Sequence, residues 1–352
     1  MTKVSTITAS YKSERYLKGF LDNVATQTHK DLEIVLDHND PSEKEISLVE
    51  EHNKKYDNVC HIQVIGVDPL GISWNRCIEF AEGDYLCIWS VDDLRTPDSI
   101  EVMAKALDEN PDVDFVYGNY YIVPSYGLKE GQLVDESDKS DLLTVGMILG
   151  PFFMFRKSFL ETTGVFDEQF TCCNDYDLAM RFARCGKGMH IPNILGYYLN
   201  EGLGQSTRSD SIQPIERTVI ELRYNIRVLE PQLVPQTRKY DVENVILDNK
   251  KTPAYKFIPE EFVIRELVNS SKSKSILCAI KFPWLTKFMK SSNTSSIKGA
   301  FDTIEFVMFV IFVMFLGISI FGLTNVENSE WYSPPLNFTA AISIISLLSI
   351  LL

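Results

Sequence analysis

The chain has 352 residues, of which 45% are hydrophobic and 23% are charged, and its formal net charge is −14. This composition is typical of a folded protein with one large or two smaller domains, and it excludes a disordered chain. The acidic balance argues against a nucleic-acid partner, because such a partner requires a face rich in Lys and Arg.

The front of the chain alternates between strand-like and helix-like patterns. Apolar and β-branched runs predict strands, and apolar residues spaced three or four apart predict helices. The predicted strands are Val4–Ala9, Leu32–Leu36, His61–Ile65, Tyr85–Trp89 and Phe115–Tyr117. The predicted helices are Arg15–Thr26, Glu43–Tyr56, Ile72–Ala81 and Pro97–Asn110. This alternation predicts an α/β fold, with a mostly parallel sheet and helices on both faces.

Polar residues follow three of the predicted strands, at Ala9–Tyr11, Asp37–Asp40 and Ser90–Asp93. In a sheet of this kind ligands bind where the strands end, so we expect the three clusters to converge on one edge. The first strand is not followed by G-x-G-x-x-G, and the chain has no G-x-x-x-x-G-K-S/T sequence. A nucleotide must therefore be held in another way than in dinucleotide-binding or P-loop folds.

Two adjacent carboxylates, Asp92 and Asp93, directly follow the apolar run YLCIW. Two such carboxylates repel each other, and the arrangement becomes favourable when a divalent cation lies between them and a phosphate ligand. Mg²⁺ or Mn²⁺ is the cation that suits these oxygen ligands. Alternatively, Asp93 or Asp98 caps the helix that begins near Pro97. The local sequence leaves both interpretations open.

A second acidic cluster, Asn174-Asp175-Tyr176-Asp177, begins a predicted helix that Gly186 ends. Acids at a helix start complement the helix dipole by ~0.3–1 kcal/mol each, which explains one acid better than two. A carboxylate that faces a cleft can instead act as general base on an acceptor hydroxyl. Arg181 and Arg184 of the same helix can pair with these acids.

Four stretches, taken in order, resemble family 2 glycosyltransferases of the inverting, GT-A fold type. They are VSTITASYKSERYLKGFLDNVATQTHKDLEIVLD, GISWNRCIEFAEGDYLCIWSVDDLRTPDSIE, GPFFMFRKSFLETTGVFDEQF and NDYDLAMRFARCG. Together they cover roughly residues 3–200, and their order and spacing carry the resemblance. The resemblance implies a nucleoside-diphosphate sugar as donor and an EC 2.4 hexosyl or related transfer.

The resemblance also implies roles for particular residues. Those assigned to the nucleotide sugar are Ala9, Ser10, Tyr11, Asp37, Asn75, Val91 and Asp92. Asp92 matches the metal ligand of the family's D-x-D motif with Asp93 as its neighbour, so both are assigned to Mn²⁺ or Mg²⁺. Asp175 matches the general base, which deprotonates an acceptor hydroxyl so that one displacement inverts the anomeric carbon.

Several positions depart from the family's pattern. Lys12 follows Tyr11 where Asn is usual, and Ser90 replaces the first Asp of the acidic motif. Trp74 stands where an arginine is common, and HNDPSE follows the second strand in place of D-G-S-T-D. These departures leave Asp92 and Asp175 in place, but the resemblance does not specify the donor.

Two apolar runs lie near the C-terminus. The first, Phe306–Leu323, has no charge and as a helix spans roughly 27 Å, close to the ~30 Å hydrocarbon core of a membrane. The second, Leu336–Leu352, is shorter and contains serines. We predict transmembrane helices over 304–323 and 336–352, and a buried core helix is the alternative for each.

The charges around these runs predict an orientation. Six lysines and no acidic residue occur within Asn269–Lys298, whereas the loop between the runs has Glu327 and Glu330 and no Lys or Arg. The positive-inside rule therefore places the residues before Phe306 in the cytoplasm. Lys281–Lys290 mixes aromatic residues with lysines, which suits an anionic membrane surface or an amphipathic helix against the soluble domain.

The N-terminus has no apolar core of about 7–15 residues, so the sequence predicts no secretory signal peptide. The seven cysteines form no C-x-x-C pair, and we expect the neighbours Cys172 and Cys173 to be reduced thiols. Both features indicate that the front of the chain stays in a reducing, cytosolic compartment.

These inferences predict a GT-A catalytic domain over 1–230, a connecting region over 231–300 that is basic near 272–298, and the two membrane segments. The expected function is a membrane-anchored inverting glycosyltransferase that faces the cytoplasm. Its expected acceptor is a hydroxyl of a polysaccharide, glycolipid or lipid-linked oligosaccharide. One alternative is a polyprenyl-phosphate sugar synthase, whose lipid phosphate acceptor needs no general base. Another is a non-catalytic membrane scaffold that binds sugar nucleotides.

Overall fold

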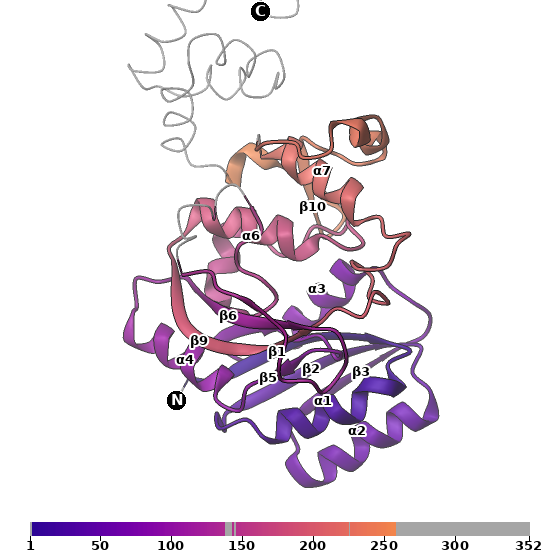
Figure 1. The fold of residues 1–352 in the computed structure, drawn as a ribbon, viewed down its shortest axis with the longest axis vertical. Coiled ribbons are helices and arrows are strands. Elements are labelled where there is room, and N and C mark those ends of the chain that lie inside the picture. The colour runs from indigo at the N-terminus through magenta and orange to yellow at the C-terminus, as the bar shows by residue number, and fades with distance from the viewer. Residues whose placement is uncertain (1, 138–142, 144–145, 225, 258–352) are drawn as a thin grey trace, which may run out of the picture. The chain divides into compact units, whose positions relative to one another are not determined.

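The computed structural model describes residues 2–137, 143, 146–224 and 226–257 (Figure 1). The strands are β1 (Val4–Tyr11), β2 (Leu32–Asn39), β3 (Val59–Val64), β4 (Tyr85–Ile88), β5 (Leu94–Arg95), β6 (Phe115–Val123), β7 (Gln132–Val134), β8 (Phe153–Arg156), β9 (Gly188–Leu199), β10 (Asn244–Leu247) and β11 (Lys250–Pro253). The helices are α1 (Glu14–Ala25), α2 (Glu43–Tyr56), α3 (Leu70–Phe80), α4 (Ser99–Glu109), α5 (Leu160–Thr163), α6 (Asn174–Cys185) and α7 (Gln213–Arg223). Short 3₁₀ segments are η2 (Lys157–Phe159), η3 (Pro231–Lys239) and η4 (Ala254–Phe257).

Within the described residues the main sheet has nine strands in the order β3-β2-β1-β4-β8-β6-β9-β5, with β7 paired to β6. The parallel pairs are β1 with β2, β1 with β4, β2 with β3 and β6 with β9. Strand β8 is antiparallel to both β4 and β6, so β4 and β6 share one direction. Six strands therefore run the same way, and the predicted mostly parallel α/β sheet is confirmed.

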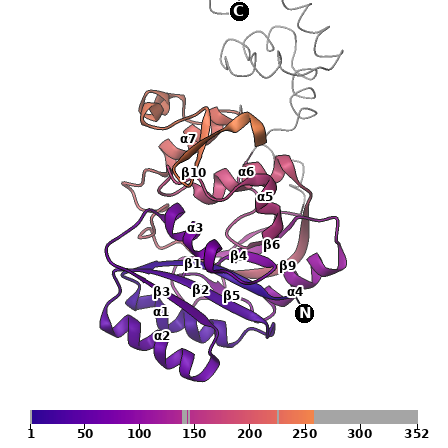
Figure 2. The same cartoon turned by 180° about the vertical axis from the view of Figure 1, so that it is seen from behind.

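The sheet separates two hydrophobic cores, because successive side chains of a strand point to opposite faces. In β2, Ile34 and Leu36 belong to the core under α1, α2 and α4. Val35, which lies between them, belongs to the core under α3, α5 and α6. Figure 2 shows α1 and α2 on one side of the sheet and α3 on the other. The helices thus cover both faces, as the sequence predicts.

Helix α2 begins and ends at the predicted residues, and its ends explain why. Ser42 and Glu45 form a capping box, in which Oγ of Ser42 accepts the Glu45 N–H and Oε2 of Glu45 accepts the Ser42 N–H at 2.9 Å. Asp57, with φ of 49°, ends the helix in the left-handed conformation. Glu45 also accepts the Ser13 N–H at 2.7 Å, so α2 holds the turn that follows β1.

The segment after α7 packs on the rest of the structure. Val245, Ala254 and Phe257 form a small buried cluster against Cys185 of α6. The described residues, which end at 257, belong to one compact unit. The structure therefore includes the start of the predicted connecting region, 231–257, in the same unit as the predicted catalytic domain.

Among the described residues, no helix is both long enough and apolar enough to cross a membrane. The predicted transmembrane segments 304–323 and 336–352 lie outside the described residues, and so does the basic stretch 272–298. These three predictions therefore rest on the sequence alone.

Candidate active site

The three polar clusters do meet at one edge of the sheet. In the parallel pairing of β1 with β2, Ala9 lies opposite Asp37. In the pairing of β1 with β4, Ile7 lies opposite Ile88, so the residues after Ile88 continue beside Ala9. The carboxyl ends of β1, β2 and β4 therefore place Ala9–Tyr11, Asp37 and Ser90–Asp93 in one neighbourhood, which is where ligands bind in such sheets.

The residues after β1 form a tight turn at this edge. Ala9 is half-buried and Ser10 is buried, with its Oγ 2.5 Å from Oγ of Ser13. Tyr11 is exposed, and Lys12 adopts a φ of 51°. In this turn the Ser10 hydroxyl is engaged by Ser13, and the Tyr11 ring is open to solvent. Their predicted contact with base and ribose stays a prediction.

Asp37 is fully buried and already has partners within the chain. Its Oδ2 lies 2.5 Å from Nη1 of Arg76, and its Oδ1 accepts the Asn39 amide at 2.8 Å. Arg76 also pairs with Asp68, so it links the end of β2 to the loop before α3. Sequence reasoning missed Arg76, although its place directly after Asn75 on the helix facing β2 is the signal that could have found it.

The side-chain amide of Asn75 both donates to and accepts from the backbone of Phe166. Its Nδ2 donates to the Phe166 carbonyl at 3.1 Å and to Oε1 of Glu168 at 3.2 Å. Its Oδ1 accepts the Phe166 N–H at 2.9 Å. The amide predicted to lie near the diphosphate thus holds the segment that leads to α6. Its described contacts are structural, and a direct role in donor binding stays a prediction.

The acidic pair after β4 splits into two environments. Asp93 is buried, and its Oδ1 accepts the Leu199 N–H of β9 at 2.9 Å. Burial, and then the charge of Asp92, raise the pKa of Asp93 well above its usual value. Asp92 is half-buried, and burial followed by the charge of Glu201 raises its pKa. Val91, which precedes the pair, is buried.

The alternative reading of the pair as helix caps finds no support among the described contacts. Asp98 occupies the N-cap position of α4, but its side chain makes no capping hydrogen bond. The Asp93 side chain bonds β9 rather than α4. Capping of α4 therefore does not explain the acids after β4.

The two acids of the second cluster, Asp175 and Asp177, also have different surroundings. Asp177 is fully buried, and its carboxylate receives Arg181, Arg223 and the Tyr224 hydroxyl at 2.7–3.0 Å. Asp175, at the start of α6, is only half-buried, and its Oδ1 accepts the Tyr176 N–H at 2.8 Å. Burial raises the pKa of Asp175 to about 6. Asp177 is thus a structural acid, whereas Asp175 is a carboxylate with a pKa suited to proton transfer near neutral pH.

Tyr198 of β9 connects the two acidic clusters. Burial, together with smaller effects of nearby carboxylate charges, raises the pKa of its phenol to about 12. These carboxylates are, in order of effect, Asp93, Asp175 and Asp92. The end of β4 and the start of α6 are therefore close to one side chain. Sequence reasoning missed Tyr198 because no local pattern marks it.

Glu201, which follows β9, bonds two residues of α1. Its carboxylate accepts the Tyr16 hydroxyl and lies 2.9 Å from Nη2 of Arg15. Tyr126 packs on Tyr16 with ring centroids 5.2 Å apart, and burial followed by the charge of Asp92 raises the pKa of Tyr126 to about 12. Aromatic side chains from α1 and the loop after β6 thus border the acidic edge.

The residues around Asp92 suit a divalent cation that is shared with a ligand. Within the described ranges, no group of three His, Cys, Asp or Glu side chains is placed to hold a metal ion. Mg²⁺ is commonly held by one or two carboxylates together with phosphates and waters. Burial is the main cause of the raised pKa of Asp92 and the charge of Glu201 is a smaller one, so a bound cation would favour the ionised carboxylate. Asp93 fits less well, because one of its oxygens already accepts a backbone N–H.

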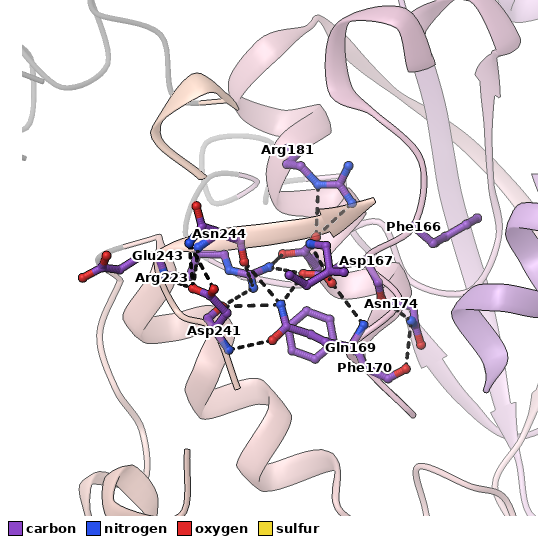
Figure 3. A network of polar contacts seen from close by, with 12 residues as sticks. Phe166, Asp167, Gln169, Phe170, Asn174, Arg181, Arg223, Asp241, Glu243 and Asn244 are labelled. Atoms are coloured by element: carbon purple, nitrogen blue, oxygen red, sulfur yellow. Dashed lines mark hydrogen bonds and ion pairs between the residues drawn. The ribbon is translucent and has the colours of Figure 1, made fainter. Parts of the chain in front are cut away.

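A buried polar network joins α6 to α7 and to the segment before β10 (Figure 3). Nη1 of Arg223 lies 2.7 Å from both Asp167 and Asp177. Its Nη2 donates to the carbonyls of Asp241 and Asn244 at 2.7 and 2.8 Å. The network ties α6, α7 and the segment before β10 into one support for the helix that carries Asp175.

A separate cavity of about 790 Å³ lies at the amino ends of β1 and β4, lined by Thr2, Tyr85 and Arg156 among others. Tyr85 begins β4, whereas Asp92 follows the other end of that strand. The guanidinium of Arg156 donates to the carbonyls of Val113 and Leu107, both at 2.8 Å. This cavity is therefore distinct from the candidate active site.

Comparison with known proteins agrees with this architecture. Residues 5–164 match the model described as glycosyl transferase family 2. An uncharacterized glycosyltransferase of Methanocaldococcus jannaschii is 24% identical over 185 residues, which cover 51% of this chain and 63% of that protein. A hyaluronan synthase of Pasteurella multocida is 24% identical over 220 residues, which cover 62% of this chain and 22% of the synthase. The chain thus spans less than two thirds of the length of these relatives.

A solved structure also resembles the fold. The crystal structure of S. aureus TarS 1–349 in complex with UDP-GlcNAc matches with a TM-score of 0.52 and 18% identity, over 82% of this chain and 79% of that one. At this identity the likeness shows the fold alone. Residues 5–164 thus resemble glycosyl transferase family 2, and the fold resembles that of TarS.

Proposed function

We propose that this protein is a membrane-anchored, inverting glycosyltransferase that moves a sugar from a nucleoside-diphosphate donor to an acceptor hydroxyl. The observation that supports the proposal is that the loop containing Asp92 is bonded through Asp93 to Leu199 of β9, next to Tyr198, whose pKa is raised by the charges of both Asp92 and Asp175. An inverting transfer needs one group for the leaving diphosphate and another for the acceptor, on opposite sides of the sugar. Two acids from distant parts of the sequence, close to one side chain, suit that division.

On the donor side, we assign to Asp92 the role of holding Mn²⁺ or Mg²⁺ together with the diphosphate. When bound, the cation offsets negative charge that develops on the leaving group. Asp93 also accepts the Leu199 N–H, which ties the loop after β4 to the end of β9, and its assignment as a second metal ligand stays a prediction. The turn after β1 and the buried Asp37 are the candidates for contact with ribose and base.

On the acceptor side, Asp175 is the general base. With a pKa of about 6 it is ionised at neutral pH and basic enough to take a proton from a hydroxyl. The acceptor O–H bond breaks toward Asp175 as the oxygen attacks the anomeric carbon. The bond from that carbon to the diphosphate oxygen breaks in the same displacement, so the configuration inverts.

The acceptor that we propose is a hydroxyl of a polysaccharide, glycolipid or lipid-linked oligosaccharide. The name of the hyaluronan synthase relative supports a glycan acceptor. A polyprenyl-phosphate acceptor is already an anion and needs no base, so loss of transfer in an Asp175→Asn variant would argue against it. Membrane anchoring through 304–323 and 336–352, with the catalytic unit in the cytoplasm, is part of the proposal and rests on the hydropathy and lysine pattern.

The test is a nucleotide-release assay on the full chain in detergent micelles. UDP-, GDP- and dTDP-sugars are supplied with glycan or lipid-linked acceptors, once with Mn²⁺ and once with EDTA. We expect release from one donor, dependent on metal and stimulated by acceptor. A folded protein that releases no nucleotide from any donor with any acceptor would refute the enzyme proposal and favour the scaffold alternative.

A further inference from the structure

Three consecutive backbone N–H groups immediately before α6 point at one carboxylate. Thr171 donates to Oε1 of Glu216 at 2.8 Å. Cys172 and Cys173 donate to its Oε2 at 2.7 and 3.1 Å. Successive N–H groups of this kind form a small anion-binding concavity, which is usually filled by a ligand. Here a side chain from α7 fills it.

The carboxylate of Glu216 is held firmly in place. Its side chain has no exposed surface, and Oε1 also accepts the Tyr240 hydroxyl at 3.0 Å. The ring of Tyr240 packs on Phe170 with centroids 5.9 Å apart. Glu216 thus accepts hydrogen bonds from four donors, and its partners lie on both sides of the turn that leads into α6.

Helix α6 depends on this contact because its own cap is weak. Cys173 is the N-cap residue, and its side chain makes no capping hydrogen bond. The carboxylate of Glu216 supplies the anionic group that a helix start favours. Asp177 anchors the far side of the first turn to Arg223, which is also on α7. Helix α7 therefore holds the first turn of α6 at two separate points.

Asp175 lies between these two attachments. Its carboxylate contacts the Tyr176 N–H of its own turn, and no described hydrogen bond joins it to α7. Its position is therefore set by the backbone of residues 173–177. A general base must lie within hydrogen-bond reach of the proton it removes, and a displacement of about 1 Å can cost about 10²-fold in rate.

From this geometry we infer that Glu216 is a positioning residue for catalysis, which orients Asp175 through the backbone of Thr171–Cys173. The inference rests on the proposed role of Asp175 as general base. Glu216 itself does not touch the reacting groups. Its removal is expected to lower kcat and to leave donor binding intact, because the donor-side residues follow β1, β2 and β4.

The experiment compares Glu216→Gln with Glu221→Gln in the full chain in detergent micelles. Glu221 is a matched control, because it lies on the same helix, is buried, and accepts a backbone N–H, that of Leu229 at 3.0 Å. For both variants we would measure kcat, donor KM, melting temperature and amide hydrogen exchange of residues 171–176. The donor is the one that the wild-type protein uses.

An amide at position 216 places an NH₂ group against at least one backbone N–H. We therefore expect Glu216→Gln to lower kcat by about 10- to 100-fold with donor KM within about twofold, and to speed exchange at 171–176. Glu221→Gln should keep wild-type kcat and wild-type exchange in that segment. Should Glu216→Gln fail to fold, Tyr240→Phe removes one donor to the carboxylate and should lower kcat in the same direction while keeping the ring.

The outcomes separate this inference from the proposed function. An active wild-type protein whose Glu216→Gln variant keeps its kcat would overturn the inference alone. Equal losses of kcat and melting temperature in the position 216 and 221 variants would do the same, because they would mean only that α7 is needed for stability. A wild-type protein that turns over no donor would overturn the proposed function, and this inference with it.

Discussion

Nη1 of Arg223 lies 2.7 Å from Oδ1 of Asp177, and neither side chain has any exposed surface. The same nitrogen is 2.7 Å from Asp167, and Nη2 of Arg181 is 2.9 Å from the second oxygen of Asp177. A buried ion network of this kind adds little over a well-packed apolar core, but removing one partner leaves an uncompensated charge in the interior. The network therefore commits α6 and α7 to one arrangement.

Replacing Arg223 with Met should strongly destabilise the protein. The variant leaves Asp167 and Asp177 buried without their shared cation, so we expect the free energy of unfolding to fall by about 3–5 kcal/mol. Urea titration followed by tryptophan fluorescence measures this change. The control is Arg208→Met, because Arg208 is exposed and pairs with Asp210 at 3.2 Å, a contact of about 0–1 kcal/mol. Equal losses in the two variants would contradict the role given to the network.

Replacing Asp175 with Asn should remove the general base and keep the fold. We expect kcat to fall by about 10²- to 10⁴-fold, the usual contribution of a positioned base. The dissociation constant of the nucleoside diphosphate should stay at its wild-type value, because our proposal assigns Asp175 to the acceptor and not to the donor. Single-turnover kinetics and isothermal titration calorimetry measure the two quantities. Asp112→Asn, at an exposed position paired with Lys187, is the control. Full turnover in the position 175 variant would refute the assignment.

The pKa of Asp175 predicts how rate and stability depend on pH. As a base it works when ionised, so kcat should rise with pH through about 6 and level off above it. In the unfolded chain the pKa returns to the lower value of 3.8, so burial favours the protonated acid in the folded state. Stability from this group is therefore fully present below pH 3.8 and is lost as the pH rises through 6.

The raised pKa of Asp175 also predicts how the melting temperature of an Asp175→Asn variant depends on pH. Asp175→Asn cannot ionise, so it should melt at a higher temperature than the wild-type protein at pH 8, and the difference should vanish at pH 4. Differential scanning fluorimetry at both pH values checks this. A melting temperature at pH 8 that is unchanged or lowered would show that burial does not disfavour the ionised carboxylate.

The sequence predicted the local elements well, because their patterns are local. The predicted helix Glu43–Tyr56 is observed with both ends in place, and the strand that ends before Asp92 is observed as β4. The convergence of the clusters after β1, β2 and β4 followed from parallel pairing alone. What the sequence could not supply are the antiparallel insertion of β8 and the pairing of β6 with β9, since both join residues distant in the chain.

The sequence also predicted part of the candidate site. Asp92 and Asp175 carry recognisable motifs, and the structure brings both near Tyr198. The motifs did not reveal that their acidic neighbours, Asp93 and Asp177, turn inward to bond β9 and Arg223. Nothing local distinguishes an acid that faces a cleft from one that faces the interior, because the difference comes from residues on other elements.

Replacing Asp92 with Ala should abolish metal-dependent donor binding. We expect the affinity for the nucleoside diphosphate in Mn²⁺ to drop to the value that the wild-type protein has in EDTA, because in our proposal Asp92 shares the cation with the phosphates. Isothermal titration calorimetry with and without metal measures both. Asp98→Ala is the control, because Asp98 is exposed and makes no capping bond to α4. Metal-dependent binding that survives in the position 92 variant would exclude this ligand.

Substitution of Asn75 can show whether its side chain holds the Phe166 backbone or contacts the donor. Its amide bonds both the N–H and the carbonyl of Phe166, and Asn53 makes the same two-way contact with Val59 on the other face of the sheet. Asn53→Leu is therefore a matched control for Asn75→Leu. Each variant leaves a backbone N–H without its acceptor, so each should lose about 1–3 kcal/mol of stability.

The two variants should differ in catalysis. Because Asn75 holds the segment that leads to Asp175, we expect Asn75→Leu to lower kcat while the affinity for the nucleoside diphosphate stays near its wild-type value, and Asn53→Leu to leave both unchanged. Denaturant titration, steady-state kinetics and calorimetry on the two proteins provide the comparison. If Asn75→Leu instead weakens nucleotide binding more than tenfold at unchanged kcat, then the side chain leaves Phe166 and contacts the diphosphate when the donor binds.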